Sequence, residues 1–266
     1  MITTAVNGGD VCGLAENAEA GTTNYTYNSL NQLTTAVTGD TTVTYTYDLN
    51  GNLVAEHGGS EDKTYTYDAD NRLVTATVSS GNNVTIESYT YDYEGNRVSR
   101  QTNEEGRIYY LNDDAYAYIQ VSLELRKAQN GSYVIHKYYT RGTELLSADI
   151  LEDNSYVKKL YIMDGHGSVT ALAENVQETG TGGNLESTEE SYSQELTDTY
   201  VYDAYGNLLK QTGDTDNDYL YTGEQYNETT GLYYLRARYL SPETGTFVSM
   251  DSYAGTLDNC CGQAFL

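Results

Sequence analysis

Residues 45–54 read YTYDLNGNLV, and closely related decapeptides occur at four other places in the chain. These copies are YTYNSLNQLT at 25–34, YTYDADNRLV at 65–74, YTYDYEGNRV at 89–98 and YVYDAYGNLL at 200–209. The first four begin at residues 25, 45, 65 and 89, so they are spaced 20, 20 and 24 residues apart. Self-similarity at such a period is typical of one small structural unit used in series. The repeat therefore decides the fold.

Each copy predicts a β-hairpin. Side chains alternate between the faces of a strand, so both tyrosines of a Tyr-x-Tyr pair point to the same face. The Asp that follows can accept hydrogen bonds from backbone amides and start a turn, and a Gly or Asn then tolerates positive φ. An aliphatic pair begins the second strand. The residues assigned to this structural repeat are Tyr45, Tyr47, Asp48, Gly51, Tyr65, Tyr67, Asp68, Tyr89, Tyr91, Asp92, Gly95, Tyr200, Tyr202, Asp203 and Gly206, with Asn71 in the glycine position of the third copy.

A single hairpin is marginally stable in water, so successive hairpins are expected to pair with one another. Stacked in order, the Tyr-x-Tyr pairs would form aromatic ladders across neighbouring strands. The alternative, that the Tyr-Asp pairs are catalytic acids, is disfavoured because five copies would serve where one suffices. The repeat is therefore interpreted as structural.

Composition restricts the partners of the chain. It carries 14 Lys and Arg against 39 Asp and Glu, a formal net charge of −25, which repels phosphate backbones and anionic membranes. The 29 tyrosines stand against two Phe and no Trp, so the core must be built largely from rings that carry a hydroxyl. Cys12, Cys260 and Cys261 lie outside the repeats, so no disulfide framework or zinc spacing is expected. Neither nucleic-acid binding nor membrane insertion is predicted.

Two further segments, together with the repeats, make the chain resemble a known family. They are YIMDGHGSVTAL at 161–172 and YTGEQYNETTGLYYLRARYLSPETGTFVSMDSY at 221–253. The repeats resemble the YD repeats of the rearrangement-hotspot (RHS) proteins, which are shared with teneurins, wall-associated proteins and the C components of insecticidal toxin complexes. The second segment is similar to the RHS-associated core, through Gly231, Tyr233, Tyr234, Arg236, Arg238, Tyr239, Pro242, Gly245 and Phe247.

The resemblance implies an all-β fold, a spirally wound antiparallel sheet of repeated hairpins that forms part of a hollow shell. In bacterial members the shell encloses a C-terminal toxin, and members that release the toxin cleave themselves with two aspartates. Asp251 matches the first aspartate, with Ser252 where the family has Pro, and the second motif is absent. One carboxylate cannot share a proton as a dyad does, so neither self-cleavage nor other enzymatic activity is expected.

The resemblance also implies a toxin or effector domain of the parent protein as the partner, no cofactor, and a secreted or cell-surface location. The opening of the chain lacks the basic stretch and apolar run of a signal peptide. An export signal would therefore belong to a longer parent. Open sheet edges would favour self-association unless charge prevents it.

The distribution of repeats along the sequence predicts five regions. They are an N-terminal flank at 1–24, YD repeats at 25–172, an acidic surface insertion at 173–198, the last repeat and core at 199–258, and a tail at 259–266. The insertion is polar and without a period, so a loop is expected there. Between 99 and 160 the period of two continues in Tyr116/Tyr118 and Tyr133/Ile135, which predicts further strands, including one at 123–128 in preference to a helical turn.

Two charged clusters leave alternatives open. Asp214, Asp216 and Asp218 resemble the start of a calcium loop, but Tyr219 stands where glycine is expected, so a solvated hairpin loop is favoured. Arg236 and Arg238 are expected on one face of a strand, where they would pair with carboxylates or stack on rings. Binding of an external anion is the alternative for the two arginines.

The sequence is thus interpreted as a non-enzymatic β-scaffold, part of an RHS/YD shell that encloses or presents a C-terminal toxin or effector. The alternative is a carbohydrate or cell-surface binding module, because a tyrosine-rich sheet can stack on sugar rings. Tyrosines on an exposed face would favour the binding module, whereas buried tyrosines favour the scaffold.

Overall fold

The computed structural model describes residues 3–4, 22–103, 106–128, 130–178 and 191–251. The described residues form strands, turns and one short 3-10 segment, with no α-helix among them, which confirms the all-β fold class. They divide into two compact units, residues 1–86 with 247–266, and residues 87–246. This division cuts across the regions predicted from the sequence. The tail at 259–266 and most of the N-terminal flank lie outside the described residues.

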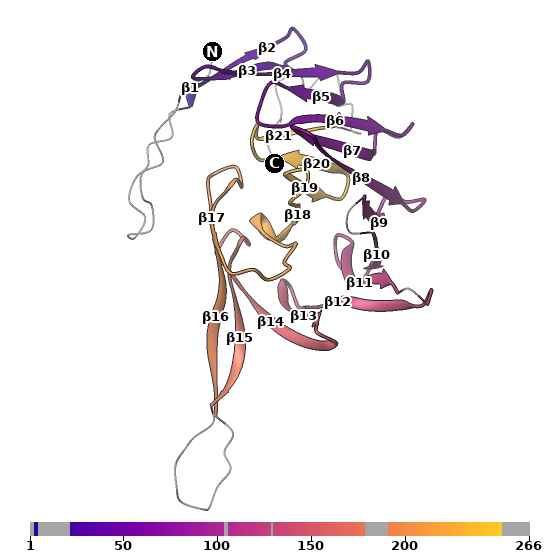
Figure 1. Cartoon of the computed structure of the whole chain (residues 1–266), viewed down its shortest axis with the longest axis vertical. Helices are drawn as coiled ribbons and strands as arrows, with labels where there is room; N and C mark the ends of the chain where they lie inside the picture. Colours follow the sequence, from indigo (N-terminus) through magenta and orange to yellow (C-terminus); the bar gives the residue numbers. More distant parts are fainter. Residues whose placement is uncertain (1–2, 5–21, 104–105, 129, 179–190, 252–266) are drawn as a thin grey trace, which may run out of the picture. The chain divides into compact units, whose positions relative to one another are not determined.

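The first unit consists of hairpins that follow one another along the chain (Figure 1). Each strand pairs antiparallel with the next, from β1 to β7. The strands are β1 (Thr3–Thr4), β2 (Thr23–Tyr27), β3 (Leu33–Thr38), β4 (Thr41–Tyr47), β5 (Leu53–His57), β6 (Asp62–Tyr67) and β7 (Leu73–Ser80).

The second unit continues the same order of antiparallel pairs from β8 to β17 and adds a small separate sheet. The division between the units falls inside β8 and inside β21. The strands are β8 (Asn83–Tyr91), β9 (Arg97–Thr102), β10 (Gly106–Asp113), β11 (Gln120–Lys127), β12 (Tyr133–Arg141), β13 (Leu145–Glu152), β14 (Ser155–Met163), β15 (Val169–Glu178), β16 (Ser191–Tyr202) and β17 (Leu208–Thr212), and then, after the 3-10 segment η1 (Tyr221–Gly223), β18 (Gln225–Asn227), β19 (Leu232–Leu235), β20 (Arg238–Ser241) and β21 (Thr246–Phe247).

An aspartate closes the turn of each repeat except the first, where Asn28 accepts the same two amide bonds. Asp48 Oδ1 accepts hydrogen bonds from the backbone amides of Asn50 and Asn52, at 2.9 and 2.8 Å. Gly51 occupies the left-handed region at φ 87°, where a Cβ would be strained. The same two amide bonds recur at Asp68, Asp92, Asp164 and Asp203. The turn is thus specified within five residues of sequence.

A β-bulge follows each of these turns. Tyr47 pairs with Leu53 but Thr46 pairs with Ala55, so Val54 is the extra residue on its strand. The same shift occurs beside Tyr27, Tyr67, Tyr91 and Tyr202. A bulge reverses the alternation locally and increases the twist of the ribbon. As a result the buried residues of β5 are Leu53 and Glu56, three positions apart, where a regular strand would bury every second residue.

Strands extend into the segment predicted to be a loop. Residues 171–178 pair with residues 191–199, so both ends of the supposed insertion at 173–198 belong to the sheet (Figure 1). Backbone pairing along two adjacent strands stabilises them even where the side chains are polar and show no period. The middle, residues 179–190, lies outside the described residues. Of the strand predicted at 123–128, residues 123–127 form the C-terminal part of β11, whereas Tyr116 and Tyr118 lie in a bend between β10 and β11 and not in a strand.

The first tyrosine is buried in four of the five copies, at Tyr45, Tyr65, Tyr89 and Tyr200, whereas Tyr25 of the first copy is half-buried. In those four copies the second tyrosine is half-buried, and the hydroxyls of Tyr67 and Tyr202 donate to backbone carbonyls, as in Tyr67 to Leu53 at 2.8 Å. The part of the chain that the structure describes contains no helix with the length and hydropathy that a bilayer crossing requires.

Candidate functional site

The core strands β18, β19 and β20 form an antiparallel sheet of their own and pack against the repeat strands of the second unit. Tyr233 and Tyr239 are almost fully buried in this packing. Figure 1 shows the core strands beside β8 and β9, the strands that the fourth repeat contributes. The segment that the resemblance singles out is therefore internal to the unit.

Side chains fasten the core to two places far apart in the sequence. On one side Tyr234 Oη accepts a hydrogen bond from the backbone N–H of Arg97 at 2.9 Å, and the ring of Tyr239 packs on Tyr89 with centroids 5.2 Å apart. On the other side Tyr233 donates to the carbonyl of Gly206 at 2.9 Å. These anchors lie at the fourth and fifth copies of the repeat, so the core ties the two copies together.

Arg97 is a buried cation at the centre of this packing, with 4% of its surface exposed. Its guanidinium carbon lies over the ring of Tyr234 at 4.1 Å and over that of Tyr110 at 4.9 Å, with Tyr89 and Tyr239 at 5.7 and 5.9 Å. Its Nη2 donates to Gln225 Oε1 at 2.6 Å. Cation–π contacts of this kind are strongest when desolvated, so the tyrosines supply much of what replaces water around the charge.

A second buried cation is held by carboxylates. Lys137 is 1% exposed, and its Nζ contacts Asp216 Oδ1 at 2.7 Å and Asp218 Oδ2 at 2.6 Å, with Glu124 Oε2 at 3.9 Å. Tyr139 donates to the other oxygen of Glu124 at 2.7 Å. Burial alone would lower the pKa of Lys137, but the carboxylates outweigh it and raise that pKa. Burial raises the pKa of Glu124, although the nearby charge of Lys137 acts to lower it.

Arg100 extends the charged interior toward β8. Its guanidinium lies 3.7 Å from Glu87 and 3.8 Å from Asp218. Glu87 is fully buried and accepts a hydrogen bond from Asn227 of the core. Removing one member of such a network leaves a buried charge without compensation, which destabilises strongly. The interior of the second unit is therefore ionic as well as aromatic.

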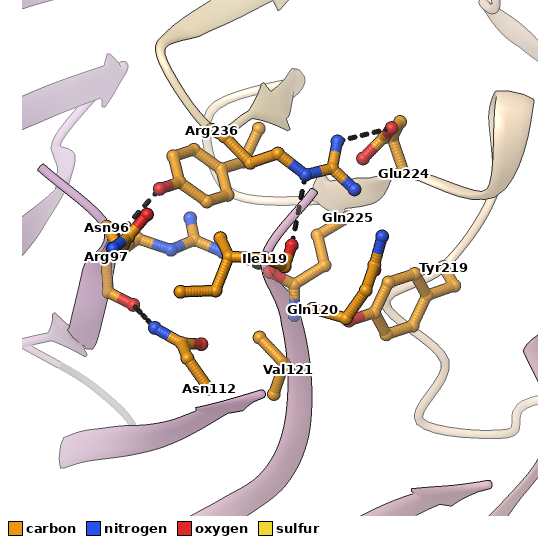
Figure 2. Close-up of a pocket in the computed structure, with 11 residues that line it drawn as sticks. Asn96, Arg97, Asn112, Ile119, Gln120, Val121, Tyr219, Glu224, Gln225 and Arg236 are labelled. Carbon is orange, nitrogen blue, oxygen red and sulfur yellow. Dashed lines mark hydrogen bonds and ion pairs between the residues drawn. The ribbon is translucent and has the colours of Figure 1, made fainter. Parts of the chain in front are cut away.

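Besides a cavity of about 10 Å³ between Arg97, Arg100 and Asp218, two cavities border this interior. The larger, of about 580 Å³, is lined by Arg100, Tyr200, Tyr226, Glu228 and the segment 214–218, so its wall is polar and acidic. The smaller, of about 20 Å³, lies between β9, β11 and the core and is drawn in Figure 2. A volume near 20 Å³ accommodates a single water or an ion of that size.

The two core arginines differ from the prediction. Arg236 lies in the turn between β19 and β20 at φ 61°, so it does not share a strand face with Arg238, which begins β20. A tight hairpin between the two short strands forces this placement. Arg236 Nη1 contacts Glu224 Oε1 at 2.6 Å, and its Nε donates to the carbonyl of Ile119 (Figure 2). The pairing with a carboxylate is therefore present, with a partner inside the core segment itself.

The remaining core-motif residues occupy turns and buried positions. Pro242 is buried, and its carbonyl accepts a hydrogen bond from Asn207 Nδ2 at 2.9 Å. Gly231 and Gly245 have positive φ, and a Cβ at Gly245 would meet the ring of Tyr205 at 3.0 Å. Phe247 is half-buried in the two-residue strand β21.

The calcium candidates and the cleavage candidate are placed as follows. Asp216 and Asp218 face Lys137, whereas Asp214 is exposed, so the three do not converge. Among the described residues no group of three or more His, Cys, Asp and Glu side chains is arranged to hold a metal. Asp251 is exposed at the end of the described residues, and Asp258 lies outside them.

The buried ions are not among the sequence predictions, although the repeat carries a signal for two of them. Leu33, Leu53 and Leu73 are buried at the first position of the second strand, and Arg97 takes that position in the fourth copy. Three positions further on, Ala36, Glu56 and Ala76 correspond to Arg100. A charged residue at a core position of a repeat is therefore a sequence signal for a buried ion.

Comparison with known proteins bears on the repeats. A family model described as the RHS repeat matches residues 27–63 and 47–84. The chain carries RHS repeats in this part of its sequence. The matched residues run from the end of β2 to the start of β8.

Proteins similar to this chain include nucleases. It is 32% identical over 148 residues, 53% of its length, to the tRNA3(Ser)-specific nuclease WapA of Bacillus spizizenii. It is 36% identical over 102 residues, 37% of its length, to the tRNA(Glu)-specific nuclease WapA of Bacillus subtilis subsp. natto. The matched regions make up 6% and 4% of those proteins, so the chain spans a small part of the relatives.

Two solved structures match most of this chain at low identity. The crystal structure of TcdB2-TccC3-TEV matches 90% of this chain and 17% of that one, at 16% identity and a TM-score of 0.40. The structure of the Photorhabdus luminescens Tc holotoxin pore also matches 90% of this chain and 17% of that one, at 16% identity and a TM-score of 0.40.

Proposed function

We propose that this chain is a non-enzymatic β-scaffold that forms the C-terminal part of an RHS shell. The shell would enclose or present a toxin or effector domain of the parent protein, outside the cell or at its surface. The observation that carries the proposal is the fastening of the core strands to the fourth and fifth repeats through Tyr234, Tyr239 and Tyr233. A core that ties separate repeats together gives a wall that resists opening.

The charge network supports a mechanical role for the same region. Lys137, Arg100 and their carboxylates are engaged with one another, and a group committed to buried ion pairs is not poised to bind and release a proton. The relatives support a larger parent, because the matched regions are small parts of proteins named as nucleases.

Protease protection of the domain that follows the core in the parent protein tests this proposal. With the natural core, the downstream domain should resist digestion at protease levels that degrade the same domain in isolation. Tyr239→Ala removes the ring that packs on Tyr89 and should make the downstream domain digestible. Tyr93→Ala, at a side chain that is 92% exposed, is the matched control. If the downstream domain is digested equally in the natural parent, in both variants and in isolation, an enclosing role is ruled out.

A second candidate is carbohydrate binding, favoured by a pair of tyrosines on the surface of the second unit. Tyr138 and Tyr156 are both partly exposed, and their rings meet edge to face with centroids 5.9 Å apart. Lys158 lies over the ring of Tyr138 and pairs with Asp149. An aromatic platform flanked by a fixed ion pair suits the apolar face and the hydroxyls of a sugar.

Titration against a panel of glycans separates the second candidate from the first. A sugar that stacks on this platform should lose at least tenfold in affinity on Tyr138→Ala and should keep its affinity on Tyr93→Ala. If the panel shows no binding, or the two variants bind alike, the exposed tyrosines are only part of the sheet surface.

A further inference from the structure

The small cavity of Figure 2 contains an unbalanced charge. Its ionisable wall residues, apart from tyrosines, are Arg97, Arg236 and Glu224. Arg236 and Glu224 form an ion pair at 2.6 Å and so neutralise each other. Arg97 forms no ion pair within 4.0 Å among the described residues, although the chain as a whole carries a charge of −25. One positive charge is left over on the wall of the cavity.

The guanidinium of Arg97 also has a donor to spare. Its Nη groups reach Tyr239 and Gln225, but its Nε–H is buried and has no hydrogen-bond partner. A buried, unpaired donor on a charged group costs more than one on a neutral group, and structures normally satisfy it. Figure 2 shows the side chain of Arg97 extending from β9 toward Ile119 and Gln225, which line the cavity with it.

A second guanidinium near the cavity is similarly unsatisfied. Arg141 lies over the ring of Tyr219, a wall residue, at 4.8 Å, and its Nε and Nη2 atoms are buried without partners. The wall also bears the side-chain amides of Gln120 and Gln225, which can donate N–H groups. The surroundings thus combine spare donors with positive potential.

We propose that this cavity binds one monovalent anion of the size of chloride, with Arg97 as its principal ligand. The volume of about 20 Å³ suits a single small ion. One negative charge balances the wall, and an anion supplies an acceptor for the Arg97 Nε–H. The bound anion would stabilise the junction between β9 and the core on which the proposed scaffold depends.

The direct test is a crystal of the full chain grown in sodium bromide. An anomalous peak in the cavity beside Arg97 is expected. A water at this place, with full density and no anomalous signal, would overturn the proposal.

The solution test compares unfolding temperatures in chloride and in gluconate at equal ionic strength. A ligand that binds only the folded chain raises the midpoint as its concentration rises, and gluconate is too large for the cavity. The natural chain should therefore unfold at a temperature a few degrees higher in chloride. Equal midpoints in the two salts would also overturn the proposal.

Two variants make the solution test specific. Gln120→Glu places a fixed carboxylate on the cavity wall, so the difference between chloride and gluconate should disappear. Gln211→Glu adds the same charge at an exposed site outside this cavity and should retain the full difference. If both variants retain it, the chloride effect arises elsewhere and the site is wrong.

Discussion

The most consequential single residues are the charged ones that the fold buries. Arg97 replaces a leucine of the repeat, and its partners Tyr234 and Tyr239 lie 137 and 142 residues further along the chain. The sequence of a single repeat cannot reveal partners so far along the chain. The turn aspartates, by contrast, bond to amides two and four residues away, so the sequence predicts the turn from its own neighbourhood.

Lys137→Met should destabilise the chain severely. The change takes the Lys137 ammonium away from the buried Glu124 and from Asp218, and breaking a buried pair in this way costs about 3–5 kcal/mol. Urea unfolding followed by circular dichroism measures the loss. Lys210→Met, at an exposed lysine, is the control and should remain within about 0.5 kcal/mol of the natural chain. Similar effects of the two changes would mean that the network contributes little.

Gly206→Ala should destabilise the fold by more than the penalty for placing a non-glycine residue at positive φ. A Cβ at Gly206 would lie 2.6 Å from the ring of Tyr221, and the residue has φ 92°. Gly81 also has positive φ but nothing within 4 Å of its Cβ position, so Gly81→Ala carries the backbone penalty of about 1–2 kcal/mol only. The difference between the two variants in unfolding midpoint reports the clash. Equal midpoints would show that Tyr221 moves aside freely.

At the scale of the element, the turn and the bulge act together. The repeat sequence predicts a hairpin, but it does not reveal that Val54 is extra and that Leu53 and Glu56 therefore share the buried face. Which strand residue is skipped depends on the pairing partner and on the twist, both of which lie beyond the local pattern. For the same reason the sequence does not predict the polar strands β15 and β16 in full, since their stability comes from backbone pairing.

Asp48→Ala should loosen one hairpin. The change removes both amide bonds and the contact with Asn52 Nδ2, and the free energy of unfolding should fall by about 1–2 kcal/mol. Hydrogen exchange of the amides of Asn50 and Asn52 gives the local measurement. Asp48→Asn keeps an acceptor at Oδ1 and should preserve most of the protection. Unchanged exchange in the alanine variant would contradict the role of the aspartate in the turn.

At the scale of the whole molecule, the tyrosines set the response to alkali. Burial is the main cause that raises the pKa of Tyr89, Tyr139 and Tyr239 well above the ordinary value, and it raises that of Tyr47 to about 12. A raised folded-state pKa gives stability that is complete below the unfolded value near 10 and is lost as pH rises above it. Each fully buried tyrosine then removes about 1.4 kcal/mol per pH unit.

We therefore expect one steep alkaline transition above about pH 10, in which circular dichroism and tyrosinate absorbance change together. The raised pKa of Lys137 acts in the same direction, because the folded chain holds that proton more tightly than the unfolded chain. Gradual ionisation of the buried tyrosines with the sheet intact would contradict this expectation.

Several tyrosine hydroxyls donate hydrogen bonds to main-chain carbonyls: Tyr67 to Leu53, Tyr202 to Val169 and Tyr233 to Gly206. A carbonyl is the same in every amino acid, so the accepting position need not keep its side chain for the bond to survive. The donor position has no such freedom, because phenylalanine would lose the bond and smaller residues would lose the ring as well. Divergence should therefore be one-sided, with related chains retaining tyrosine at the donors and varying at the acceptors other than Gly206, which its positive φ and Tyr221 keep as glycine.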